Sequence, residues 1–313
     1  MTQEYYVTDE NLDQRLDLYL TTIQNSLSRS LIRQKINAGE VMVNDKVEYR
    51  PHYRVKLDDK IKISLDVILP QELKLEPENI PIDIVYEDDD LLVVNKPSGM
   101  VIHPATGNYT GTLMNAIAFH YKGIKNVGSE IRSGLIHRID KDTSGLVMIG
   151  KTNKGLWYYS KLFAEREVNK TYIAIIAGNI SSKIPEQGLV VRNYLGRCPG
   201  NRKKYSVVNP TMGRISETKI NLLDFTESNQ GKFSLVTAMP KTGRTHQIRV
   251  HLSNLGFPIV GDVIYGRRNK YSRLMLHAWK IKVKLLNGKT KELIAPIPDN
   301  FSEFNFNGIN NIQ

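Results

Sequence analysis

Cysteine is almost absent from this sequence of 313 residues, which contains only Cys198. A single cysteine cannot form an intrachain disulfide, and no second cysteine exists to complete a CxxC zinc or redox motif. The cysteine content therefore fits a reducing compartment and argues against a structural zinc site.

Long apolar runs are also missing. Nowhere do about 18 apolar residues follow one another, as a membrane-spanning helix would require. The first residues, MTQEYYVTDENLDQR, have neither the basic nor the apolar part of a secretory signal. We therefore expect a protein that is neither embedded in a membrane nor exported, and that works in the cytoplasm.

Motifs that hold nucleotide phosphates or metal ions do not occur either. Neither GxxxxGK[ST] nor GxGxxG is present, so nucleotide hydrolysis has no visible machinery. Several histidines neighbour polar segments, but none pairs with another at HxxxH spacing beside a glutamate. We therefore expect no metal. These histidines are His103, His137, His246, His251 and His277.

Positive charge, in contrast, is in excess. Lys and Arg number 43 against 32 Asp and Glu, which gives a net charge of +11 and an isoelectric point near 9.5. A polyanion is the natural partner of such a chain. Composition does not distinguish RNA from DNA or from an acidic membrane, and a merely soluble basic protein is the alternative.

The first part of the chain, residues 13–68, is expected to form a small module. Apolar residues in DQRLDLYLTTI and SRSLIRQKINAGE predict two short helices, the second with Ser28 or Ser30 as N-cap and Gly39 as its stop. VMVNDKVEYR alternates around an Asn-Asp turn, which favours a hairpin, and DDKIKISL predicts another strand. Positive side chains would cover the helices, unless they only form a solvated face: Arg15, Arg29, Arg33 and Lys35.

Residues 69–82 carry three prolines and alternating charges without periodicity, which is typical of a linker. The following segment, residues 83–303, alternates irregularly between strands such as KTYIAIIAG and helices such as GTLMNAIAFHY and RTHQIRVHLSNLG. Because no regular βαβ rhythm appears, we predict an α+β domain with a mixed, largely antiparallel sheet.

An unusual concentration of charge lies in residues 133–150, SGLIHRIDKDTSGLVMIG. Five charged or titratable side chains separate two apolar pieces there. Asp140 precedes the turn into the buried run LVMI, so its carboxylate either caps that turn or is held ready for a reaction. For an isolated aspartate in a loop, the cap is the commoner role.

Two further segments favour the reactive interpretation. PKTGRTHQIRVHL places His246 and Arg249 on one face of a predicted helix, and REVNKTYIAIIAG places Tyr172 at the entry to an apolar strand. Ordinary structural roles are the alternatives: Thr245 as the N-cap, His246 as a satisfied half-buried histidine, and Tyr172 as a core aromatic residue.

Together these motifs resemble the RluA-type pseudouridine synthases. The resemblance rests on YEDDDLLVVNKPSGMVIHP, GLIHRIDKDTSGLVMIGKT, KTYIAIIAG, GRTHQIRVHL and GDVIYG, in this order. HR[IL]D-x-x-TSG is highly specific, and Ile139 replaces its commoner leucine with a side chain of equal volume. The N-terminal module resembles the small αL RNA-binding module of a ribosomal protein, so the two likenesses cover residues 13 to 300.

The resemblance implies an enzyme that isomerises uridine in RNA without a cofactor, because nothing is oxidised and nothing is transferred. Asp140 matches the catalytic aspartate, and Arg249 matches the arginine that keeps it ionised, by a bidentate grip. Burial would otherwise disfavour the charged carboxylate. Tyr172 matches the tyrosine that stacks on the detached uracil. Arg138 is a candidate to fill the gap that the extruded nucleotide leaves.

Further basic segments, GRCPGNRKK and GRRNKYSR, and a strand with Lys280, Lys282 and Lys284 on one face, are expected to line a groove for an RNA stem-loop. HPATGNYTGTLMNAIAFHY most resembles the branch that acts on a helix-loop of large-subunit ribosomal RNA. We therefore expect ribosomal RNA or a pre-ribosomal particle as partner, and a monomer.

Three other functions remain open. They are a synthase of the same family that acts on other ribosomal or transfer RNA sites, a non-catalytic RNA-binding assembly factor, and an enzyme that hydrolyses nucleosides. Hydrolysis would require a second acid or base, and no paired acidic residue stands out.

Overall fold

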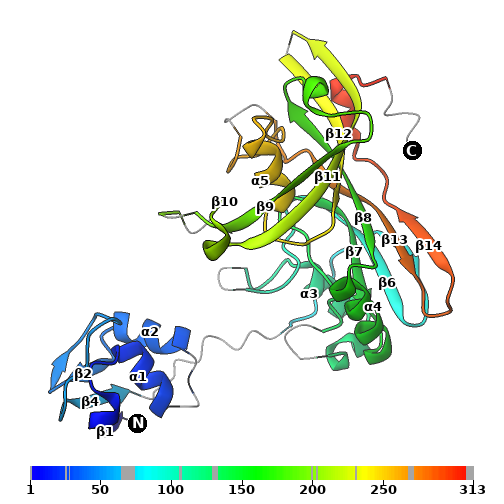
Figure 1. Cartoon of the computed structure of the whole chain (residues 1–313). Coiled ribbons are helices and arrows are strands. Elements are labelled where there is room, and N and C mark those ends of the chain that lie inside the picture. The colour runs from blue at the N-terminus through cyan, green and yellow to red at the C-terminus, as the bar shows by residue number, and fades with distance from the viewer. Residues whose placement is uncertain are drawn as a thin grey trace. The chain divides into compact units, whose positions relative to one another are not determined.

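The computed structural model describes residues 2–24, 27, 29–64, 75–105, 108–128, 133–198, 200–201, 204–229, 231–266 and 271–307. The chain divides into two units, Met1–Glu72 and Leu73–Gln313 (Figure 1). None of the helices in these ranges has the length and apolar character that a membrane crossing needs.

The first unit packs two helices on a four-stranded antiparallel sheet in the order β1-β4-β2-β3. Its elements are β1 (Thr2–Tyr6), the 3-10 helix η1 (Asp9–Asn11), α1 (Leu16–Ile23), α2 (Arg29–Asn37), β2 (Val41–Val43), β3 (Lys46–Val47) and β4 (Lys60–Ser64). Pairs of apolar residues four positions apart, such as Leu16 with Leu20 and Ile32 with Ile36, are fully buried and hold the helices to the sheet.

The helices and the hairpin predicted for this unit are confirmed. Asn44 and Asp45 both have positive φ, 52° and 63°, as a two-residue hairpin turn requires. Gly39 follows α2 with a φ of 77°. The proposed N-cap Ser28 lies outside the described residues, as does the side chain of Ser30.

The second unit is built on a ten-stranded sheet in the order β10-β9-β11-β12-β8-β13-β7-β6-β5, with β14 beside β13. The pairing of β13 with β7 is parallel and the other pairings described in this sheet are antiparallel, which confirms the predicted mixed α+β class. The strands are β5 (Ile84–Glu87), β6 (Leu91–Lys96), β7 (Ser144–Gly150), β8 (Asn169–Ala177), β9 (Leu189–Arg197), β10 (Tyr205–Val207), β11 (Arg214–Ser228), β12 (Gly231–Pro240), β13 (Leu276–Lys284) and β14 (Thr290–Ile294).

The helices of this unit are α3 (Leu113–His120), α4 (Asn153–Glu165) and α5 (Gln247–Asn254), with 3-10 helices η2 (Lys122–Asn126), η3 (Ser181–Lys183), η4 (Pro210–Met212) and η5 (Asp299–Phe304). Figure 1 shows α3 and α4 beside the β6–β7 half of the sheet and α5 beside the β9–β12 half. Helices therefore cover both halves of the sheet.

Strands β6 and β7 are covered on both faces, which explains their continuous apolar sequences. Leu92 and Val94 pack with residues of α3, whereas Leu91 and Val93 pack with Tyr159 of α4. Successive residues of one strand thus enter different cores.

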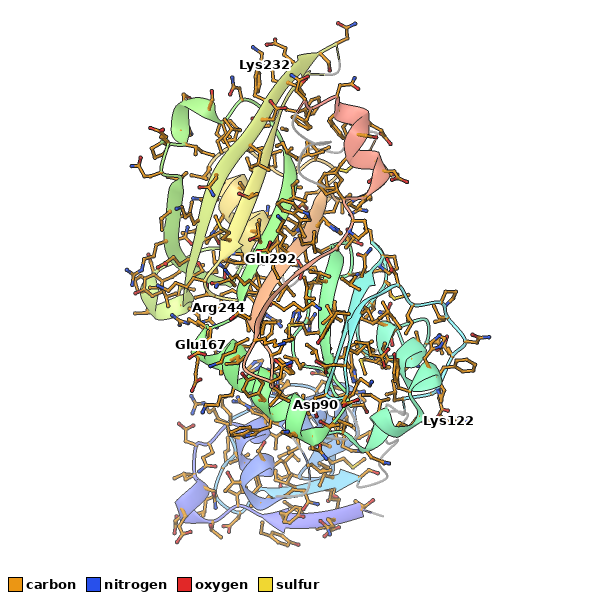
Figure 2. All side chains as sticks on the ribbon, turned by 90° about the vertical axis from the view of Figure 1, so that its right-hand side faces the viewer. Asp90, Lys122, Glu167, Lys232, Arg244 and Glu292 are labelled. Atoms are coloured by element: carbon orange, nitrogen blue, oxygen red, sulfur yellow. The ribbon has the colours of Figure 1, made fainter. Side chains whose placement is uncertain are left out.

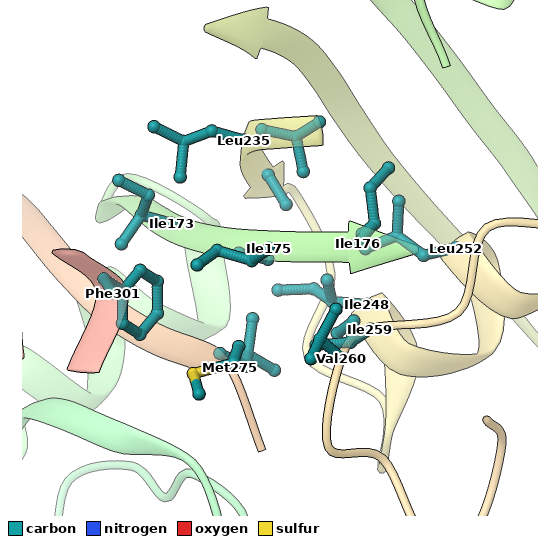
Figure 3. Packing of buried hydrophobic residues seen from close by; sticks show 14 of the residues in the cluster. Ile173, Ile175, Ile176, Leu235, Ile248, Leu252, Ile259, Val260, Met275 and Phe301 are labelled. Carbon is teal, nitrogen blue, oxygen red and sulfur yellow. The ribbon is translucent and has the colours of Figure 1, made fainter. Parts of the chain in front are cut away.

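The other core lies between α5 and the middle of the sheet. Figure 3 shows Ile248 and Leu252 of α5 beside Ile175 and Ile176 of β8, with Phe301 of η5 at the far end of the same cluster. Lys232 and Lys122 lie near opposite ends of this unit (Figure 2).

The predicted division into 13–68, 69–82 and 83–303 stays a prediction, and residues 65–74 lie outside the described part of the chain. Two observations bear on its boundaries. Strand β1, which precedes residue 13, pairs with β4. Leu75 is buried against the second unit, and Asn115 of α3 donates to the carbonyl of Glu76.

Candidate active site

Asp140 lies in the turn that leads into β7, at the place where β7 meets β13. The backbone N–H of Thr143 donates to the Asp140 carbonyl at 3.2 Å. Two residues into the strand, Gly145 has a φ of 110°, and a Cβ there would lie 2.3 Å from the carbonyl oxygen of Ala278. Only glycine permits this close parallel pairing, so the TSG motif fixes where the Asp140 turn sits on the sheet.

A buried lysine ties the Asp140 turn to the loop after β6. Lys96 is fully buried, and its ammonium donates to three main-chain carbonyls, those of Pro97 (2.7 Å), Met100 (2.9 Å) and Lys141 (3.0 Å). Ser98 adds a bond to the carbonyl of Asp142 at 2.6 Å. Burial lowers the pKa of Lys96 to about 7, against the opposing charges of Asp142 and Asp140. The NKPSG and HRIDKD motifs therefore build one structure.

A cleft of about 300 Å³ opens at this turn, which is large enough for a nucleobase. It brings together the three predicted catalytic side chains, Asp140 from the turn, Tyr172 from β8 and Arg249 from α5. Arg138, also predicted, lines the cleft and is exposed. Segments more than 100 residues apart in sequence thus share one cavity.

Tyr172 is half-buried and packs against two cores of the second unit, the one beside α5 and the one beside α3. Burial, and then the charge of Asp140, raises the pKa of its hydroxyl, which therefore stays protonated at neutral pH. Tyr172 is thus both a packing residue, as the structural alternative proposed, and part of the wall of the cleft.

Arg249 contacts two carboxylates, and its stronger contact is one that the sequence interpretation missed. Its Nε and Nη2 donate to the two oxygens of Asp262, both at 2.8 Å, whereas its Nη1 lies 3.5 Å from Oδ2 of Asp140. The predicted bidentate grip on Asp140 is therefore wrong. The guanidinium fork holds Asp262, and its remaining nitrogen faces Asp140.

Asp262 is completely buried in the loop after α5. Burial alone would raise the pKa of its carboxyl, but the hydrogen bond and charge of Arg249 outweigh this and hold that pKa below its ordinary value. The backbone N–H groups of Ile264 and Tyr265 donate to the same carboxylate at 2.9 and 3.0 Å. Asp262 and Tyr265 both belong to the GDVIYG motif. This motif was the sequence signal that could have identified them as residues of the site.

His246 lies at the start of α5, where it replaces the predicted cap. The helix begins at Gln247, and His246 rather than Thr245 occupies the N-cap position, without a capping side-chain bond. Its φ of 56° is in the left-handed region, which a non-glycine residue adopts rarely. The imidazole is turned into the cleft, with Nε2 at 3.9 Å from Oδ2 of Asp140.

Asp140 therefore has two cationic or polar neighbours instead of a cap. Its side chain is 21% exposed, and within the described ranges its carboxylate accepts no bond from the backbone of its own turn. The capping alternative does not describe this residue.

The predicted RNA-binding arginines of the first unit surround one buried carboxylate. Arg15, Arg29 and Arg33 all pair with Asp17, at 3.0, 3.0 and 3.8 Å, and remain 36–48% exposed. Lys35 differs from the prediction, because it is buried and paired with Glu40 at 2.5 Å. Its position in the last turn of α2 places it against the following loop rather than on the solvent-exposed face of the helix.

The other expected basic segments are only partly described. Residues 199, 202, 203 and 267–270 lie outside the described ranges. On β13, Lys282 and Lys284 are exposed, while Lys280 lies 3.9 Å from the ring centre of Trp279. In the described part of the chain, no group of three or more His, Cys, Asp or Glu residues could hold a metal ion.

Comparison with known proteins identifies the family. A family model described as RNA pseudouridylate synthase matches residues 90–254, more than half of the chain. The chain belongs to this family. As a member it is an RNA pseudouridine synthase, so the predicted family and enzyme class are confirmed. A second model, the S4 domain, matches residues 14–61 of this pseudouridine synthase, which agrees with the predicted RNA-binding module.

Individual relatives of the pseudouridine synthase cover nearly all of it. Ribosomal large subunit pseudouridine synthase D from Borreliella burgdorferi is 37% identical over 96% of this chain and 91% of its own length. The protein of the same name from Zymomonas mobilis is 36% identical over 95% and 90%. The solved structure of human RNA pseudouridylate synthase domain containing 1 superposes with a TM-score of 0.57 at 26% identity, over 70% of this chain and 84% of that one.

Proposed function

We propose that this pseudouridine synthase isomerises specific uridines in large-subunit ribosomal RNA, with Asp140 as the catalytic residue and without a cofactor. The relatives named for the large ribosomal subunit support the substrate class. The net charge of +11 and the S4 module support a large, folded RNA as partner.

The reaction breaks the bond from uracil N1 to ribose C1′, turns the base and joins C1′ to C5. C5 releases its proton and N1 gains one, so the product is an isomer of uridine and the step needs no oxidant and no group donor. A carboxylate can act either as nucleophile on the nucleoside or as stabiliser and proton acceptor for the sugar fragment. Asp140 is suited to both roles, because its carboxyl group lies 3.5 Å from Nη1 of Arg249 and lines the cleft.

Tyr172 and Arg138 complete the proposed handling of the nucleotide. The uridine must leave its stack to reach Asp140, because this side chain lines the cleft and is only 21% exposed. The ring of Tyr172 would stack on the detached uracil, and the exposed guanidinium of Arg138 would brace the helix that the nucleotide leaves.

The observation that carries this proposal is the convergence of Asp140, Tyr172 and Arg249 on one nucleobase-sized cleft. We expect Asp140→Asn to lose all detectable pseudouridine formation on ribosomal RNA while binding the RNA nearly as tightly as the wild type. Release of tritium from [5-³H]uridine-labelled RNA measures the reaction, and filter binding measures affinity. Asp299→Asn, in η5 and away from the cleft, serves as the matched control. Retained turnover in Asp140→Asn would refute the role of Asp140.

The substrate is tested separately. Pseudouridines are mapped in ribosomal and transfer RNA from cells with and without the gene for this protein, and from cells that carry Asp140→Asn. Sites lost only from large-subunit RNA are expected. Loss from transfer RNA alone would favour a synthase for other sites, and a ribosome-assembly defect that Asp140→Asn repairs would favour a binding factor.

A further inference from the structure

His246 lines the cleft near the Asp140 carboxylate, and the proposed function gives it no role. Its Nε2 lies 3.9 Å from Oδ2 of Asp140, which is longer than a hydrogen bond. Its backbone is held in the left-handed region without a capping bond in return. Such a conformation has a free-energy cost, and side chains held this way occur mainly where their direction matters.

The other ring nitrogen of His246 is fixed by Tyr265. Nδ1 of His246 lies 2.8 Å from the Tyr265 hydroxyl, and that hydroxyl accepts the backbone N–H of Tyr205 at 2.9 Å. Among the described residues, Nδ1 is the hydrogen-bond acceptor available to the Tyr265 proton. The hydroxyl therefore donates to Nδ1, which leaves the proton of a neutral imidazole on Nε2.

The protonation state of His246 agrees with a neutral ring that carries its proton on Nε2. Burial lowers the pKa of His246, against the opposing charge of Asp140, so the neutral ring predominates at neutral pH. Its Nε2–H then points toward the carboxylate of Asp140 as a donor.

Arg249 approaches that carboxylate at the same oxygen. Its guanidinium is already neutralised by Asp262, and only Nη1, 3.5 Å from Oδ2, is left for Asp140. Two donors therefore converge on Oδ2, and Oδ1 is the oxygen left for the nucleotide. Arg249 alone would hold the Asp140 carboxylate loosely, because two of its nitrogens already bind Asp262. Two donors that approach from different directions fix the rotation of the carboxylate.

We propose that His246 is a positioning residue, which donates its Nε2 proton to Oδ2 of Asp140 and thereby presents Oδ1 to the ribosyl bond of uridine. The inference rests on the proposed function of Asp140. The distance of 3.9 Å shortens to a hydrogen bond when uridine fills the cleft, as catalytic contacts commonly do on substrate binding. The backbone N–H of Tyr205 and the hydroxyl of Tyr265 set the tautomer.

Two substitutions separate this role from a conformational one. Glutamine places its amide donor where Nε2 lies, and asparagine places it where Nδ1 lies. Asparagine is the residue that better tolerates the left-handed backbone. We expect His246→Gln to keep kcat within about threefold, and His246→Asn to lose roughly 10- to 100-fold in kcat with little change in KM, the effect of one hydrogen bond to a charged group. His120→Gln, on the surface at the end of α3, is the unchanged control.

A spectroscopic measurement tests the tautomer without RNA. In protein with ¹⁵N-labelled histidine, the His246 imidazole should be neutral with its proton on Nε2, and Tyr265→Phe should abolish this preference. A proton on Nδ1 in the wild type, or equal losses of kcat in the Gln and Asn variants, would overturn the assignment. Because the tautomer is read without catalysis, an inactive wild-type protein would count against the proposed function and not against this inference.

Discussion

Arg249 is the residue on which the electrostatics of the site depend, because it faces two carboxylates at once. Removing its guanidinium leaves Asp140 without its nearest cation and Asp262 without its only close side-chain cation among the described residues. The two consequences are separable, since one concerns rate and the other stability.

For the rate, we expect Arg249→Ala to lower turnover at neutral pH, because the Asp140 carboxylate then loses the guanidinium nitrogen that faces it at 3.5 Å. The measurement is kcat/KM for the wild type and the variant. Equal values would contradict the electrostatic role.

For the stability, Asp262→Ala should cost roughly 3–5 kcal/mol, because it leaves a buried guanidinium without its bidentate partner. Urea denaturation measures the free energy of unfolding. Glu227→Ala is the matched control, because it breaks an exposed pair with Lys232 that is worth less than about 1 kcal/mol. A cost for Asp262→Ala no larger than that of the control would show that the pair is not a structural requirement.

At the scale of the element, helix α5 is positioned by a buried histidine as well as by its apolar face. His251 is fully buried, and its ring nitrogens bond Thr218 and Ser216 of β11 at 2.9 and 3.0 Å. This polar anchor fixes the rotation of α5 about its axis, which the apolar contacts of Ile248 and Leu252 leave less defined. The direction of Arg249 follows from it.

The buried histidines make stability depend on pH. Burial lowers the pKa of His251 and of His277 to about 4, and that of His137 to about 3. In the unfolded chain these histidines have a pKa of about 6.5, so they take up protons there at a higher pH than in the folded protein. The folded form therefore loses stability as the pH falls below 6.5. His251 and His277 each contribute up to about 3 kcal/mol to this loss by pH 4.

We therefore expect the free energy of unfolding to fall already between pH 6.5 and 5, before most carboxylates titrate. Urea denaturation at several pH values measures it, and His251→Asn should reduce the slope, whereas the exposed-site variant His120→Gln should not. A flat stability over this interval would contradict neutral burial of these rings.

At the scale of the whole molecule, the two units have separate cores and separate sheets. The boundary at 72/73 lies just before Leu75, which packs with α3. We expect the chain 73–313 to remain folded and soluble but to bind ribosomal RNA more weakly, with a smaller dependence of affinity on salt, because the arginines around Asp17 are lost.

The truncation is measured by circular dichroism, thermal unfolding and RNA binding at several salt concentrations. A chain starting at residue 79 provides the contrast, since it also removes Leu75 and the backbone contacts of Glu76 and Glu78 with Asn115. That longer truncation should unfold at lower temperature. An insoluble 73–313 would show that the second unit does not fold alone.

Local structure was predictable from the sequence, because it depends on short-range periodicity. The two helices of the S4 module, its hairpin turn, the buried run LVMI in β7 and the mixed α+β class were all expected and are present. The charge cluster around Asp140 was also recognisable, since an apolar frame around five titratable residues is visible without coordinates.

Which side chains pair with one another, in contrast, was decided by the tertiary structure. Sequence reasoning assigned the Arg249 fork to Asp140 and expected Lys35 on an open face, because a pattern gives the charge of a side chain but not its direction. The close packing of α5 against the sheet selects Asp262 as the bidentate partner and turns His246 into the cleft. The loop after β6 and the Asp140 turn together enclose Lys96. Hydrogen bonds act over about 3 Å, so contacts between segments 100 residues apart exist only once the chain has folded.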